Sequence, residues 1–177
     1  WKASPTAFRQ LMIGLLFFGL INSSDVFLLL QTKQITGDDS KVLMVYIFYN
    51  LVFALFALPL GRLADKIGMK KMIVFGLVLF SVVYTGMGLT GDFRMVLILF
   101  FLYGIYAAAT EGVAKALISN LVPKTSTGTA IGFYAGWNSI RAFVASSVAG
   151  SLWHFVSPDA ASICSARGSL FAAIYLH

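Results

Sequence analysis

Charged residues are scarce in this sequence. Asp, Glu, Lys and Arg make up 11% of the 177 residues, whereas apolar types make up 59%. Soluble globular domains carry about 25% charged residues. A soluble fold of this size could not bury so much apolar surface, so the composition indicates an integral membrane protein that contacts the lipid bilayer.

Cysteine and histidine are nearly absent. Cys164 is the only cysteine, which excludes a disulfide framework and a cysteine-based metal site. The two histidines, His154 and His177, occur without the H-E-x-x-H, G-x-S-G or G-x-G-D motifs of intramembrane proteases. No Walker loop for ATP is present either. We therefore expect a protein that is not an enzyme and that uses no metal, nucleotide or redox cofactor.

Long apolar runs dominate the chain instead. Five of them are long enough to cross a bilayer as helices, and a sixth is shorter and contains Arg167. They cover about 8–30, 42–60, 72–89, 95–121, 129–153 and, for the sixth, 160–176. The runs are continuous rather than alternating, which favours helices over a β-barrel. The sequence predicts an all-α integral membrane fold, with residues 1–177 forming a single bundle of six transmembrane helices.

The basic residues indicate an orientation. The formal net charge is +6, but the cations lie in loops between apolar runs, so no nucleic-acid surface is expected. Cytoplasmic loops carry an excess of Lys and Arg. If the N-terminus is inside, seven cations lie in the cytoplasm: Lys2, Arg9, Arg62, Lys66, Lys70, Lys71 and Lys124. Three then lie outside: Lys33, Lys41 and Arg94. Both termini are then expected to be cytoplasmic.

The segment GRLADKIGMKK, residues 61–71, is expected to be a loop between the second and third spans. A positive-inside signal explains its cations, but it does not explain Asp65 or the placing of the two glycines. The segment resembles the signature of the major facilitator superfamily, G-x-L-A-D-[RK]-x-G followed by basic residues. That family carries its signature between the same two spans.

The resemblance implies one six-helix half of a two-bundle permease of a bacterial inner membrane. The stretches NSSDVFLLL, EGVAKALISNLVP and GTAIGFYAG look like a second, C-terminal half. The other half would be a second copy or a missing N-terminal half. In the family this loop is a cytoplasmic gate, which would comprise Gly61, Arg62, Asp65, Lys66, Gly68, Lys70 and Lys71. The alternative is a solvated turn whose charges only set the topology.

Charges inside the apolar runs are the candidate functional residues, because such charges are costly in lipid and face a cavity or a partner. Glu111 and Lys115 lie four apart and could pair on one helix face. Arg141 lies deep in the fifth run and needs a carboxylate or an anionic substrate. The substrate or proton pathway is predicted to include Asp25, Glu111, Lys115, Asn138 and Arg141, with Glu111 or Asp25 as the proton-coupling acid.

Two readings of the function remain open. The first is a secondary transporter that moves a small-molecule substrate by alternating access and is coupled to protons. The second is a non-transporting membrane subunit or a truncated permease. Glycines 128, 132 and 136 repeat every four residues, a pattern that more often indicates close helix packing than a ligand site. Tyr103 and Tyr134 are candidates for substrate contact, although packing is the commoner role of such aromatic residues.

Overall fold

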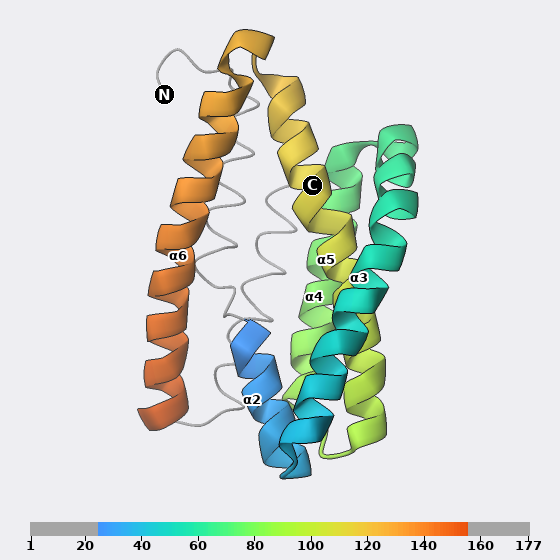
Figure 1. Ribbon diagram of the computed structural model, residues 1–177, viewed down its shortest axis with the longest axis vertical. Coiled ribbons are helices and arrows are strands. Elements are labelled where there is room, and N and C mark those ends of the chain that lie inside the picture. Colours follow the sequence, from blue (N-terminus) through green and yellow to red (C-terminus); the bar gives the residue numbers. More distant parts are fainter. Residues whose placement is uncertain (1–24, 156–177) are drawn as a thin grey trace.

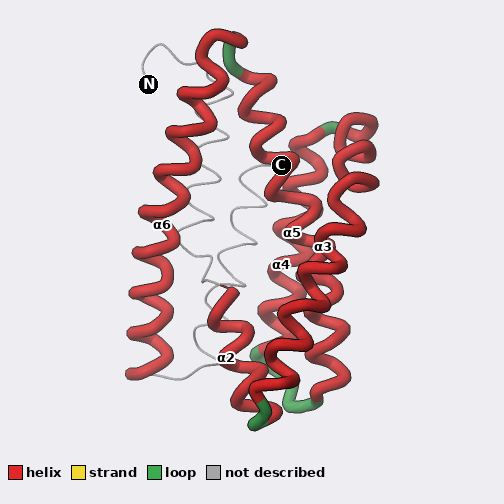
Figure 2. The backbone as a smooth tube through the Cα atoms, in the orientation of Figure 1, coloured by secondary structure: helices red, strands yellow, loops and turns green. Residues whose placement is uncertain are grey.

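The computed structural model describes residues 25–155; positions 1–24 and 156–177 lie outside the described range. Every element in that range is helical, which confirms the all-α fold class. Figure 2 shows short loops joining long helices. The helices are α2 (Asp25–Thr36), α3 (Asp39–Ile67), α4 (Met69–Met87), α5 (Phe93–Leu121) and α6 (Thr127–Phe155), with a short 3-10 helix η1 (Lys124–Ser126) before α6.

Three helices, α3, α4 and α5, are long and apolar enough to cross a membrane. An α-helix rises 1.5 Å per residue, so the 29 residues of α3 extend well beyond a hydrocarbon core of about 30 Å. α6 is equally long and carries Asn138, Ser139 and Arg141 within it. The predicted first and sixth spans fall mostly or wholly outside the described range.

The signature segment is not the loop that its sequence suggested. Residues 61–67 continue α3, and Gly68 alone separates α3 from α4. Gly68 has a φ of +104°, a conformation that L side chains rarely adopt. Its N–H donates to the carbonyl of Ala64 at 2.9 Å, which ends α3. The helix continues through GRLADKI because this segment contains no proline and, after Gly61, no glycine before Gly68.

α5 is the central helix and packs along both α3 and α4 (Figure 1). Two glycines permit this close approach. A Cβ on Gly76 of α4 would collide with the Thr110 side chain, and one on Gly104 of α5 would lie 2.8 Å from the Tyr49 carbonyl oxygen. α6 touches α5 over a shorter stretch.

Aromatic rings fill the core between α3, α4 and α5. Ring centroids are 5.6 Å apart for Tyr49 and Tyr103, and 5.3 Å apart for Tyr103 and Tyr106. Phe80 continues the series to Tyr106 at 5.1 Å and stacks on Tyr84 at 4.1 Å. Tyr103 is only 2% exposed, so its role is packing within the core.

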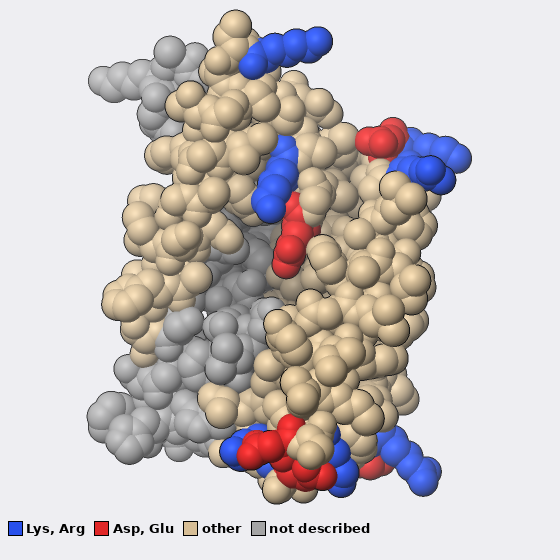
Figure 3. Space-filling model, in the orientation of Figure 1, with Lys and Arg blue, Asp and Glu red and all other residues tan. Residues whose placement is uncertain are grey.

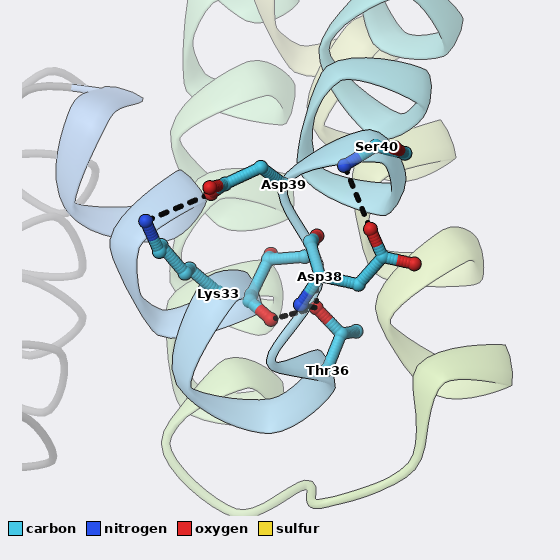
Figure 4. A network of polar contacts seen from close by, with 6 residues as sticks. Lys33, Thr36, Asp38, Asp39 and Ser40 are labelled. Carbon is cyan, nitrogen blue, oxygen red and sulfur yellow. Dashed lines mark hydrogen bonds and ion pairs between the residues drawn. The ribbon is translucent and has the colours of Figure 1, made fainter.

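Polar contacts close the end of the molecule where α2 meets α3 (Figure 4). Lys33 and Asp39 form an ion pair of 2.8 Å, and the Asp38 carboxylate caps α3 by accepting from the Ser40 N–H at 2.8 Å. The Lys41 ammonium lies over the Phe93 ring, 5.5 Å from its centroid, and thereby joins α3 to the start of α5. The turn from α4 to α5 is therefore held against the α2–α3 corner.

Most of the surface of α3 is apolar and open. Its exposed side chains repeat along the helix about every four residues: Leu43, Ile47, Leu51, Leu55 and Leu58. Lipid is the solvent that suits such a face, because no aqueous surface tolerates a stripe of this length. The fold therefore contacts the bilayer along α3.

Candidate functional site

The candidate gate residues gather where α3 turns into α4, at the end of the molecule opposite the α2–α3 corner (Figure 1). Figure 3 shows charged side chains concentrated at these two ends, with a basic and an acidic group between them over α5. Five of the seven predicted gate residues are charged. They lie on the last turns of α3 or the first turn of α4, and all five are exposed: Arg62, Asp65, Lys66, Lys70 and Lys71. The structure thus keeps the signature residues together.

Asp65 lies at a groove between α3 and α5. The groove encloses about 200 Å³. Its α3 wall consists of Phe53, Ala57, Gly61, Ala64 and Asp65. Its α5 wall contains three small residues spaced four apart, Ala108, Gly112 and Ala116, together with Val113. Among the residues that the structure describes, Asp65 is the only charged one that lines it.

The α5 wall was missed by the sequence analysis. The signal was present, because A-x-x-x-G-x-x-x-A places three small residues on one helix face. The two glycines that face the groove, Gly61 and Gly112, have no described heavy atom within 4 Å of an added Cβ.

Glu111 and Lys115 are both exposed on α5. The expected pairing of the two is wrong. Lys115 forms no ion pair with any residue that the structure describes, so it does not neutralise Glu111. The spacing allows the pair, but the two side chains do not form it.

Asn138 lies on the inner side of α6. Ala130, Ile131 and Tyr134 pack against the core, and Asn138 follows one turn later on the same face. Its Oδ1 atom is buried and accepts no hydrogen bond from any residue that the structure describes. A buried acceptor without a donor is costly, so this atom is a candidate contact for a donor group on a ligand.

The side chains of Asp25 and Arg141 lie outside the described part, although their backbones belong to α2 and α6. Glycines 128, 132 and 136 have no described atom within 4 Å of an added Cβ. The expectation that these glycines mark close helix packing is therefore wrong for the described residues.

Gln31 is a buried polar residue that the sequence analysis also missed. It is 5% exposed, and its Nε2 donates to the Met87 carbonyl oxygen at 2.7 Å. That carbonyl belongs to the last turn of α4, where no helical N–H is available to it. Gln31 therefore ties α2 to the end of α4.

Comparisons with known proteins agree with this architecture. The sequence model of the Major Facilitator Superfamily matches residues 8–176. An uncharacterised MFS-type transporter of Methanocaldococcus jannaschii is 30% identical over 164 residues, which are 89% of this chain and 41% of the relative. One from Mycobacterium tuberculosis is 26% identical over 149 residues, 82% of this chain and 25% of that protein. The chain thus spans well under half the length of these relatives.

Proposed function

Because the chain belongs to the Major Facilitator Superfamily, we propose that it forms one half of a secondary transporter that moves a small solute by alternating access. The observation that carries this proposal is the signature segment, which joins two membrane-crossing helices at one end of the bundle. Substrate sites of such transporters lie near the bilayer midplane between two bundles. The second bundle is supplied by a further part of the protein or by another copy of this chain.

The proposed substrate path runs along α5 and α6. Glu111 is exposed on α5, and Asn138 presents an unsatisfied carbonyl oxygen from the inner side of α6. We assign Glu111 the binding of the coupling proton, because a carboxylate within a membrane span can take up and release a proton as its surroundings change. Asn138 would accept a hydrogen bond from the solute. Lys115, Arg141 and Asp25 complete the proposed path.

The proposed gate lies at the Gly68 corner. Asp65 and its basic neighbours are exposed at one end of the bundle, where they can form and break contacts with a second half. We place this end in the cytoplasm and both chain termini on the same side, as the distribution of cations predicts. A bacterial inner membrane is the proposed location.

Uptake into proteoliposomes tests the function. Purified protein is reconstituted with a trapped pH-sensitive dye, and sugars, organic anions and organic cations are added in turn. A solute that moves with protons changes the internal pH. We expect Glu111→Gln to reduce this proton signal at least tenfold, whereas Asp39→Asn, which removes an exposed acid at the opposite end, retains it.

Two results would contradict the proposal. Proton-coupled uptake at the wild-type level by Glu111→Gln would remove that residue from the coupling step. Failure of every solute class to move, in protein whose mass in detergent shows both bundles present, would favour a non-transporting membrane subunit instead.

A further inference from the structure

Two opposite charges lie one turn apart on the open side of α5. After Arg94 in the first turn, Glu111 and Lys115 are the only charged residues of this helix. Four residues separate them, which is a rise of about 6 Å along the helix axis. Both side chains are exposed, and Figure 3 shows a basic and an acidic group over α5 between the two charged ends of the molecule. An otherwise apolar span therefore presents one charge of each sign.

These two charges do not neutralise each other. No ion pair joins Glu111 to Lys115, and Lys115 pairs with no other residue that the structure describes. Charges within a membrane span are costly and face a cavity or a partner. A cationic solute would pair with Glu111 and leave Lys115 without a counter-charge. A solute that carries both signs can pair with both residues and adds no net charge to the span.

Asn138 brings a second hydrogen-bond acceptor to the depth of Glu111. α5 ends at Leu121 and α6 begins at Thr127, and the two helices run in opposite directions from the turn between them (Figure 1). Counted along each helix from that turn, Glu111 and Asn138 both lie about 15–17 Å away. The Asn138 Oδ1 atom is buried and has no donor among the described residues. An anionic solute without N–H groups would pair with Lys115 but would leave this acceptor unsatisfied.

We propose that the solute is a zwitterion with an ammonium group and a carboxylate, as in an amino acid. The ammonium has three N–H donors, which serve the Glu111 carboxylate and the Asn138 Oδ1 atom. The carboxylate of the solute pairs with Lys115. The inference rests on the proposed function, because it names the substrate class of the path along α5 and α6. One carboxylate cannot hold a proton and pair with an ammonium at once, so the coupling proton and the solute bind Glu111 in turn.

Thermal unfolding of the purified full-length protein in detergent tests the substrate class, since a ligand that binds the folded state raises the midpoint. The probes are the common amino acids, β-alanine and 4-aminobutyrate, each compared with its decarboxylated amine and its deaminated acid. For leucine these analogues are 3-methylbutylamine and 4-methylpentanoate. We expect at least one amino acid to raise the midpoint and to bind at least tenfold more tightly than either of its analogues.

Single substitutions assign each charge of the solute to its residue. Lys115→Gln should weaken binding of the amino acid at least tenfold and leave binding of the amine unchanged, because the amine makes no use of Lys115. Asn138→Ala should weaken binding of the amino acid and of the amine, but not of the deaminated acid. Lys124→Gln removes an exposed cation from the turn before α6 and should change none of these affinities.

Three results would overturn the proposal: no amino acid raises the midpoint, a singly charged analogue binds as tightly as its parent, or Lys115→Gln weakens the amine and the amino acid equally. Solute uptake separates this proposal from the proposed function. Uptake of a sugar or of a singly charged solute alone retains transport and rejects the zwitterion. Selective binding of an amino acid without uptake retains the zwitterion site and rejects transport.

Discussion

At the scale of single residues, polar side chains act in this structure by satisfying particular backbone groups or by remaining unsatisfied. Gln31 belongs to the first kind, because it donates a hydrogen bond to the buried Met87 carbonyl oxygen at the end of α4. The Asn138 Oδ1 atom belongs to the second, because it is buried without a donor. The first role stabilises the fold, and the second leaves an atom available to a ligand.

We expect Gln31→Leu to destabilise the protein by about 1–3 kcal/mol, because the Met87 carbonyl oxygen would be buried without its donor. Gln34→Leu is the matched control, since Gln34 is exposed on the same helix and should change the stability little. Thermal unfolding in detergent, followed by circular dichroism, measures both. Equal midpoints for the two variants would show that the contact between Gln31 and Met87 adds no stability.

At the scale of helices, α5 organises the bundle because its two sides serve different purposes. One side presents Gly104 to α3 and Thr110 to α4 at close contact, and it carries the aromatic core. The other presents Glu111 and Lys115 in exposed positions. A change on the packed side should therefore disturb the fold, whereas a change toward the open groove should be tolerated.

Gly104→Ala tests this distinction. The added methyl group would lie 2.8 Å from the Tyr49 carbonyl oxygen and from Val52, which forces α3 and α5 apart. Overpacking of this kind costs about 1–3 kcal/mol. Gly112→Ala, two turns along the same helix, has open space and should retain the wild-type unfolding midpoint. A midpoint for Gly104→Ala equal to that of Gly112→Ala would contradict the packing role of Gly104.

At the scale of the whole molecule, antiparallel helices separate two polar ends by an apolar body (Figure 3). The Gly68 corner and the turn before α6 occupy one end, whereas the α2–α3 corner and the turn from α4 to α5 occupy the other (Figure 1). The first end holds Arg62, Lys66, Lys70, Lys71 and Lys124. An excess of cations at one end is the pattern that cytoplasmic loops show.

Cysteine labelling in intact cells tests this orientation. In a Cys164→Ser background, Thr125→Cys should be protected from a membrane-impermeant maleimide, because it lies at the end proposed to be cytoplasmic. Gly91→Cys, in the exposed turn from α4 to α5, should react from outside. Disrupted cells should label both positions. The reverse pattern in intact cells would place the gate outside and contradict the proposed topology.

The sequence by itself determined the membrane environment, the all-α fold and the family, because apolar runs of span length and the GRLADKIG segment are local properties of the chain. For the second to fifth runs it also placed the helices within a few residues, except where α3 continues through the signature to Gly68. The first run was predicted to end at Leu30, whereas α2 continues to Thr36. The point at which α3 ends depends on the backbone conformation of Gly68. Residue types alone indicate such a conformation only weakly.

Only the tertiary structure decided which small residues pack and which stay open. The sequence pattern of glycines 128, 132 and 136 indicated packing, yet in the described part of the chain the tight contacts are at Gly76, Gly86 and Gly104. The same holds for the α3–α5 groove and for Gln31, whose partner is 56 residues away. Spacing along one helix defines a face, but what covers that face depends on how distant segments pack against it.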